Sequence, residues 1–304
     1  MTTTKTNANV PTQGTVLEKS AMLVKLIRHK FNHNAFDKEL SAKLAKEMKA
    51  EGTNVVRVNK TIIPKEACKG FTTVLNEGGK YFYAVTLPWD DKGYRLLPVV
   101  KYKEFVNKFR EFQTRFQNAT DDFIANLDSH IDAGKADLGL AASDDDYVDK
   151  QSAREDFLLK VEYETIKSGN DFRAQVTEEE RQEIAEVIGQ QHKEKFTAAQ
   201  ESVFIRIKEA TGKLIEKMNE PAARGKKTPE FRDSIIGNIQ GLVDILPSLN
   251  ISNNPDLDAL KDKLDLDLAS LDPEDLRECG ELRKDTAAKA EEIYETAEAF
   301  MGKI

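Results

Sequence analysis

Cysteine is scarce in this chain: its 304 residues include two, Cys68 and Cys279, far apart in the sequence. A disulfide-stapled scaffold is therefore excluded, and a reducing cytoplasm is the expected compartment. Long apolar runs are also missing. No stretch approaches the roughly 18 apolar residues that a membrane helix needs, so we expect no membrane partner. The start, MTTTKTNANVPTQGT, lacks the apolar core of a secretion signal, and we interpret residues 1–19 as a disordered polar tail.

Residues that commonly carry chemistry are few and scattered. The four histidines are His29, His33, His130 and His192. His29 and His33 would share one face of a helix, but in a strand they would lie roughly 13 Å apart, so we interpret them as surface residues. The run Asp144–Asp146 lacks the alternating ligands and the turn glycine of a calcium loop. We interpret that run as a solvated cluster.

Sequence motifs of the common enzyme classes are also missing. No phosphate-binding glycine loop, dinucleotide fingerprint, serine elbow or paired-cysteine motif occurs. We therefore expect no metal and no cofactor, and we nominate no catalytic residue. An enzyme with an unfamiliar carboxylate site stays open as a third hypothesis, because carboxylates are abundant and nothing in the sequence selects a pair.

The net charge of −8 hides a strong asymmetry along the chain. Residues 1–120 carry 21 basic and 11 acidic side chains, residues 121–156 carry 3 and 11, and residues 255–304 carry 7 and 15. Two interpretations remain open. The basic third forms a face for an anionic partner, or the acidic segments pack against it within one chain or between copies.

The first hundred residues predict a small mixed sheet. Residues 22–31 and 54–63 are typical of strands, and Asp37 is a good cap for a helix that ends at Gly52. Residues 81–89 and 94–100 are rich in aromatic and branched side chains and flank the turn Asp90-Asp91-Lys92-Gly93, which predicts a hairpin. We expect Pro88 and Pro98 at strand ends, since proline cannot donate to a ladder.

Helical periodicity begins at Tyr102. Phenylalanines at 105, 109, 112, 116 and 123 predict a long amphipathic helix whose aromatic stripe is covered. Thr177, followed by three glutamates, predicts the start of a helix over residues 178–219. Further helices are predicted over 230–246, ended by Pro247, and over 255–268 and 273–301. Residues 158–166 and 172–176 predict a second hairpin.

These elements give an α+β, predominantly helical fold, with a small mixed sheet and a long helical bundle or coiled-coil part. We expect a small α/β domain over residues 20–100, completed by strands in 158–176. Residues 101–304 are expected to form an elongated helical domain with acidic C-terminal helices.

Cations and aromatic rings are interleaved in the basic third, which is a pattern of nucleic-acid binding. The candidate residues for this function are Lys25, Arg28, Lys30, Arg57 and Lys60. In the alternative interpretation the rings are half-buried in a sheet and the cations lie on its wet face. The acidic balance of the whole chain favours this alternative.

A set of short motifs between residues 20 and 265 resembles an uncharacterised family of phage and bacterial proteins, classed as a domain of unknown function. The motifs are TLPWDDKGYRLLP from Thr86 to Pro98, Asp171-Phe172-Arg173, Phe231-Arg232-Asp233-Ser234 with Asn238, and Leu246-Pro247-Ser248-Leu249-Asn250. Tyr147-Val148 stands where the family usually has a tyrosine–proline pair, which departs from the pattern. Some members are neighbours of AAA+ ATPases of the MoxR and cobalt-chelatase type, sometimes with an integrin-like metal-binding domain. The resemblance implies an adaptor or substrate role beside such an ATPase, and a phage origin, which would make the compartment the host cytoplasm.

Our leading hypothesis is a non-enzymatic interaction or assembly protein that forms a homo-oligomer or docks on a protein partner through its helical stripes. The alternative is a nucleic-acid-binding protein of phage replication, repair or host takeover. The candidate interaction surface comprises Trp89, Asp90, Asp91, Tyr94, Arg95, Arg173, Arg232 and Asp233. For the three arginines we also consider a structural role as partners of carboxylates such as Asp233.

Overall fold

The computed structural model describes residues 13–52, 55–167, 177–221 and 232–302. The chain forms two compact units, and neither is continuous in sequence. Unit 1 comprises residues 1–25, 83–103 and 163–304, and unit 2 comprises residues 26–82 and 104–162. This division differs from the expected domains, 20–100 and 101–304, because each unit pairs segments that are distant in sequence. Among the described residues, no helix combines the length and apolarity that crossing a bilayer requires.

The fold is α+β and predominantly helical, as predicted. A four-stranded sheet has the order β4-β5-β1-β6, and β2 and β3 form a separate two-stranded sheet. The strands are β1 (Ala21–His29), β2 (Asn34–Asp37), β3 (Val58–Thr61), β4 (Leu87–Pro88), β5 (Arg95–Pro98) and β6 (Leu158–Glu164). β5 pairs antiparallel with both β1 and β4, and β2 pairs antiparallel with β3.

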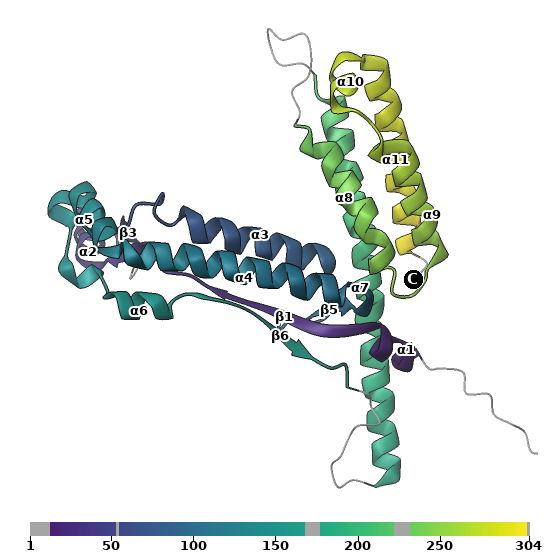
Figure 1. Cartoon of the computed structure of the whole chain (residues 1–304), viewed down its shortest axis with the longest axis horizontal. Coiled ribbons are helices and arrows are strands. Elements are labelled where there is room, and N and C mark those ends of the chain that lie inside the picture. Colours follow the sequence, from purple (N-terminus) through teal and green to yellow (C-terminus); the bar gives the residue numbers. More distant parts are fainter. Residues whose placement is uncertain (1–12, 53–54, 168–176, 222–231, 303–304) are drawn as a thin grey trace, which may run out of the picture. The chain divides into compact units, whose positions relative to one another are not determined.

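Long helices dominate both units (Figure 1). Those up to residue 155 are α1 (Gln13–Ser20), α2 (Lys38–Glu47), α3 (Lys69–Val85), α4 (Tyr102–Ala125), α5 (Leu127–Leu138) and α6 (Lys150–Glu155), with 3₁₀ turns η1 (Val99–Lys101), η2 (Gly139–Ala141) and η3 (Asp144–Asp146). The later ones are α7 (Glu178–Asn219), α8 (Ser234–Leu249), α9 (Pro255–Leu264), the π-helical η5 (Asp265–Ala269), α10 (Pro273–Glu278) and α11 (Gly280–Met301). The helix α1 occupies part of the segment that we expected to be a disordered tail.

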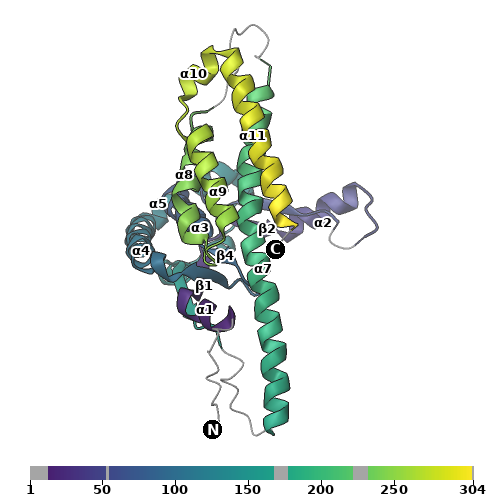
Figure 2. The same cartoon turned by 90° about the vertical axis from the view of Figure 1, so that its right-hand side faces the viewer.

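The core of unit 1 forms where α8 and α11 pack on α7 and where α9 packs on α8 and α11 (Figure 2). The predicted start of α7 is confirmed: the Thr177 hydroxyl accepts the Glu180 amide, and the Glu180 carboxylate accepts the Thr177 amide. Buried residues of α7 begin at Ala199 and continue through Phe204, Ile207 and Leu214. The second half of the helix therefore supplies the packing surface that its apolar stripe predicted.

The core of unit 2 is aromatic and lies between α3 and α4. The phenylalanine stripe of α4 is buried, as predicted, by Phe105, Phe109, Phe112, Phe116 and Phe123. Their rings contact Tyr81 and Phe82 of α3 and, further along, Phe31, Phe71 and Phe157. The contacts of Phe71 with Phe123 and of Phe116 with Phe157 are edge to face, a geometry that adds to the free energy of apolar burial.

The predicted strand over residues 81–89 is wrong. Helix α3 continues to Val85, and only Leu87 and Pro88 pair with β5, in the register Leu87↔Leu96. Phe71, Leu75, Phe82 and Val85 are buried, and their spacing follows one face of a helix. Tertiary packing of that face decides against the local strand propensity of the aromatic residues. The predicted turn at 90–93 is confirmed, with Gly93 at a φ of +90°.

Other predicted boundaries also change. The helix that we expected to end at Gly52 ends at Glu47. α8 continues past Pro247 to Leu249, because Leu246 and Leu249 are buried and the Asn250 amide bonds to the Leu246 carbonyl. The predicted helix over 273–301 is broken at Cys279, whose extended backbone and sulfur cap α11. In the second predicted hairpin, residues 158–164 form β6, and its expected partner, 172–176, lies outside the described residues.

Candidate functional site

The β4–β5 turn brings three predicted surface residues together in unit 1. Trp89, Asp90 and Tyr94 line a cleft of about 260 Å³. The turn is closed by the Asp90 carboxylate, which accepts the Tyr94 amide at 2.9 Å, and by the Asp90 carbonyl, which accepts the Gly93 amide. Asp91 lies on the exposed side of this turn. The sequence therefore predicted the composition of one wall of the cleft.

The opposite wall of the cleft is supplied by α7. The ring of His192 lies 5.5 Å from that of Trp89, and the ammonium group of Lys195 lies over the Trp89 ring at 5.5 Å. Burial, and next the charge of Lys195, lower the pKa of His192 below its usual value, so the imidazole is neutral at pH 7. Lys25 lies over the Tyr94 ring at 5.4 Å. Trp89 itself is buried in the core, so its main role is to anchor the hairpin.

Arg95 does not line this cleft, and its side chain bonds at the C-terminal end of α3. Its Nε donates to the Thr86 hydroxyl at 2.7 Å and its Nη2 to the Thr86 carbonyl at 3.0 Å. Its guanidinium lies 5.0 Å from the Tyr83 ring centroid. The partners of Arg95 are therefore Thr86 and Tyr83, whereas we had considered a carboxylate as its partner.

Arg206 of α7, which sequence reasoning missed, binds the same end of α3 as Arg95. It donates to the carbonyls of Ala84 at 2.8 Å, Tyr83 at 3.1 Å and Thr86 at 2.5 Å. These carbonyls lie at the end of a helix, where no further turn supplies amide donors. An arginine set among Phe204, Ile205 and Ile207 is the one signal in the sequence that could have found this contact.

Arg232 and Asp233 do not line the hairpin cleft. Arg232 is exposed and lines a different cleft of about 360 Å³ with Lys213 and Ser234. Asp233 forms an ion pair with Arg277, and Arg173 lies outside the described residues. Of the eight predicted residues, Trp89, Asp90 and Tyr94 line one cleft and Arg232 lines another.

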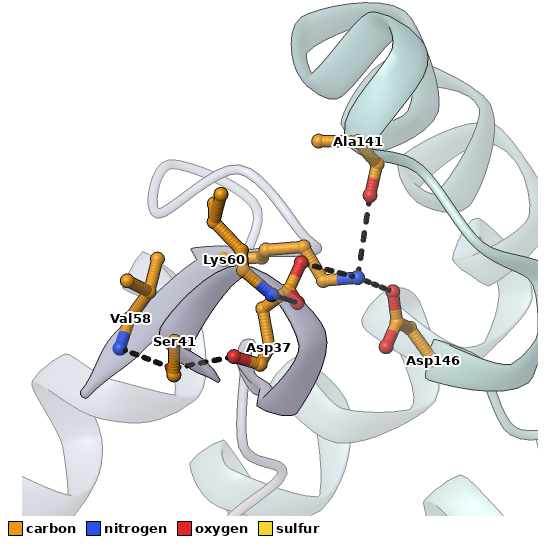
Figure 3. Close-up of polar contacts among 7 residues, drawn as sticks. Asp37, Ser41, Val58, Lys60, Ala141 and Asp146 are labelled. Atoms are coloured by element: carbon orange, nitrogen blue, oxygen red, sulfur yellow. Dashed lines mark hydrogen bonds and ion pairs between the residues drawn. The ribbon is translucent and has the colours of Figure 1, made fainter. Parts of the chain in front are cut away.

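Lys60, a nucleic-acid candidate, is the centre of a polar cluster in unit 2 (Figure 3). Its ammonium group lies 2.6 Å from Asp146 Oδ2, 3.5 Å from Asp37 Oδ2 and 3.2 Å from the Ala141 carbonyl oxygen. The bond to Asp146 is the main reason that the pKa of Lys60 is raised above its usual value. These contacts tie the β2–β3 hairpin to the segment that connects α5 with α6.

Asp37 and Ser41 complete the cluster. Asp37 caps α2 by accepting the Leu40 amide at 2.8 Å, and this bond is the main reason that the pKa of Asp37 is lowered. The Ser41 hydroxyl donates to the Asp37 carbonyl and accepts the Val58 amide at 2.9 Å (Figure 3). The cluster therefore joins β2, α2 and β3, a part of the chain (residues 34–61) that we call the arm.

The other nucleic-acid candidates are placed as follows. Arg28 donates to the Leu75 carbonyl at 3.2 Å, and the Arg57 guanidinium lies 4.7 Å from the Phe36 ring centroid. Lys25 lies over Tyr94, and Lys30 is exposed. Four of the five therefore have contacts within the chain, and the nucleic-acid hypothesis stays a prediction.

Four acidic side chains of the segment 121–156 form ion pairs with cations. Lys135 pairs with Asp144, Lys150 with Asp128 and Arg154 with Asp121. The Lys60–Asp146 contact joins this segment to the basic third. In the described ranges, no three His, Cys, Asp or Glu side chains are grouped so that they could hold a metal ion.

We expect Lys60→Met to loosen the arm while the rest of unit 2 stays folded, because three contacts of the ammonium group are lost. Hydrogen exchange of the β2 and β3 amides should accelerate about tenfold relative to α4, since local opening governs exchange. Lys46→Met, which removes an exposed cation of α2, should leave exchange unchanged. Equal protection in the two variants would show that the cluster does not hold the arm.

The same experiment has a defined pH dependence. Because the pKa of Asp37 is lowered on folding, its contribution to stability is complete above its unfolded pKa of about 4 and is lost as the pH falls through the lowered value. Exchange of the arm amides, corrected for intrinsic rates, should therefore accelerate selectively only below about pH 4.

Comparisons with protein-family models, with curated proteins and with solved structures find no match to this chain.

Proposed function

We propose that this chain is a non-enzymatic interaction or assembly protein that works in the cytoplasm and docks on a protein partner or on a second copy through the arm. The observation that supports the proposal is a row of large apolar side chains that the arm leaves in solvent. The exposed fractions are 43% for Phe36, 36% for Leu40, 71% for Met48 and 61% for Val55.

The arm has almost no apolar core of its own. In its described residues, 34–52 and 55–61, Ser41 alone is buried. A helix of ten residues and a two-stranded hairpin are each marginal in water without tertiary packing. Leu40 lies in the first turn of α2, and Met48, eight residues further on, caps the C-terminal end of that helix. Fully burying an exposed side chain of this size releases about 1.5–3 kcal/mol. Covering these side chains with a partner releases the fraction of that value that corresponds to their exposed area.

An adaptor beside a ring ATPase of the MoxR or cobalt-chelatase type, encoded by a phage, is the specific form of this proposal that the family resemblance suggests. Such a partner would need an apolar groove that accepts one face of a short helix, which is a common mode of peptide recognition. Phage origin and the ATPase partner are parts of the proposal.

The test is the mass of the full chain in solution, together with retention of a partner from lysate. We expect a mass above the 34.2 kDa of one chain, or a retained protein, and we expect Leu40→Ser/Met48→Ser to abolish it. The control Leu266→Ser removes a largely exposed leucine outside the arm and should change nothing. A strict monomer that retains no protein, or equal behaviour of the two variants, would refute docking through the arm.

Nucleic-acid binding is the second candidate function, and one contact favours it. The exposed Phe36 ring and the Arg57 guanidinium on it form a cation–aromatic pair of the kind that holds a base and its phosphate. A filter-binding assay separates the two functions, because phosphate contacts weaken steeply with salt and apolar docking does not. No binding at low salt would remove this candidate.

A further inference from the structure

Two arginines of unit 1 converge on one residue. Arg95 and Arg206 both donate an Nη2 hydrogen bond to the Thr86 carbonyl, at 3.0 and 2.5 Å. The two nitrogens therefore lie closer together than the sum of these distances. Thr86 is fully buried, so the meeting point of the two guanidinium groups is fixed by the core.

Little negative charge offsets the two guanidinium groups where they meet. Every acceptor of the two guanidinium groups in the described part of the chain is neutral: the hydroxyl and carbonyl of Thr86 and the carbonyls of Tyr83 and Ala84. The C-terminal dipole of α3 supplies about half a negative charge. Burial, and next the like charge of Arg95, lower the pKa of Arg206 to about 10, while Glu209 acts weakly in the other direction. An excess of positive charge remains.

Hydrogen-bond donors also remain. Arg95 Nη1 and Arg206 Nε take part in none of the hydrogen bonds above. Arg95 and Arg206 are half-buried, so each residue keeps some contact with solvent. The Tyr83 ring, half exposed and 5.0 Å from the Arg95 guanidinium, borders the same place.

We infer that Arg95 and Arg206 form a binding site for a phosphate dianion, either the free ion or the phosphate group of a small monoester. A planar guanidinium matches the oxygen spacing of phosphate, and charge-assisted hydrogen bonds of this type are among the strongest in proteins. Two cations held side by side favour a doubly charged anion over a carboxylate. This site is independent of the arm and of the proposed docking function.

The experiment is titration calorimetry of the full chain with inorganic phosphate and with phenyl phosphate, each at constant ionic strength against chloride. We expect saturable binding, and we expect Arg95→Gln to weaken it at least about tenfold, the usual cost of losing a charged hydrogen-bond partner. Tighter binding of phenyl phosphate would identify a monoester as the ligand, and equal binding would identify the free ion.

The matched control is Arg232→Gln, which removes an exposed arginine of the same unit and should leave the affinity unchanged. Equal weakening in both variants would mean diffuse charge attraction, and absence of binding by the parent chain would overturn the inference directly. If Arg95→Gln does not fold, the Arg206 Nε–Hε resonance of the parent chain replaces it. That signal should shift on adding phosphate, and a signal that does not move would also overturn the site.

Discussion

Replacing Gly134 by alanine is expected to destabilise unit 2 by about 3 kcal/mol, the upper part of the range for overpacking. Gly134 is buried in α5, where that helix passes directly over the chain that follows β3. An added Cβ would overlap the carbonyl oxygen of Ile62 and lie 2.8 Å from its carbonyl carbon. Backbone atoms cannot rotate away as a side chain can, so α5 or the Ile62 segment must move.

Gly78→Ala is the matched control in the same unit. Gly78 lies within α3, and an added Cβ would lie 3.6 Å from the Phe112 ring, an ordinary van der Waals distance. Alanine should stabilise that helix by about 0.5–1 kcal/mol, because glycine loses more backbone entropy on folding. Urea unfolding followed by circular dichroism measures both variants. If Gly134→Ala is as stable as the parent chain, α5 does not approach Ile62 this closely.

Phe71→Ala is expected to cost about 3–5 kcal/mol, the range for deleting a buried aromatic ring. Phe71 is fully inaccessible, and its ring meets those of Phe157 and Phe123 edge to face, at 4.9 and 5.3 Å. Its loss leaves a cavity at the junction of α3, α4 and the segment before β6. Phe36→Ala, at an exposed position, should cost less than about 1 kcal/mol.

The choice of probe matters for Phe71→Ala. The single tryptophan, Trp89, lies in unit 1, so its fluorescence does not report directly on unit 2. Hydrogen exchange of the α3 and α4 amides reports on the cavity itself. We expect these amides to lose protection while those of α11 keep theirs. Protection that is unchanged in α3 would show that the aromatic cluster is not the core of unit 2.

The arm has little apolar core and depends on the Lys60 cluster, which is fixed on the segment between η2 and η3. A partner that covers Met48 and Leu40 would therefore be presented with a preformed face, and less conformational entropy would be lost on docking.

Local signals in the sequence were sufficient for several elements. The start of α7 at Thr177, its end at Asn219 and the cap of α2 at Asp37 were predicted correctly, because capping depends on residues three or four positions apart. The phenylalanine stripe was also sufficient to predict α4 and its buried face, because the stripe has the period of a helix and apolar side chains in such a stripe must be covered.

Tertiary structure alone decided the rest. Residues 81–85 have the composition of a strand, yet they are helical because Phe82 and Val85 extend the face that α3 buries. The hydrogen bond from Arg206 to Thr86 joins residues 120 positions apart, and that from Lys60 to Ala141 joins residues 81 positions apart. No local pattern specifies such contacts, since each depends on where the packed helices place the chain. The sequence by itself thus determined the capped starts of α2 and α7 and the buried stripe of α4. The packing of helix faces decided where α3 ends and which charged side chains meet.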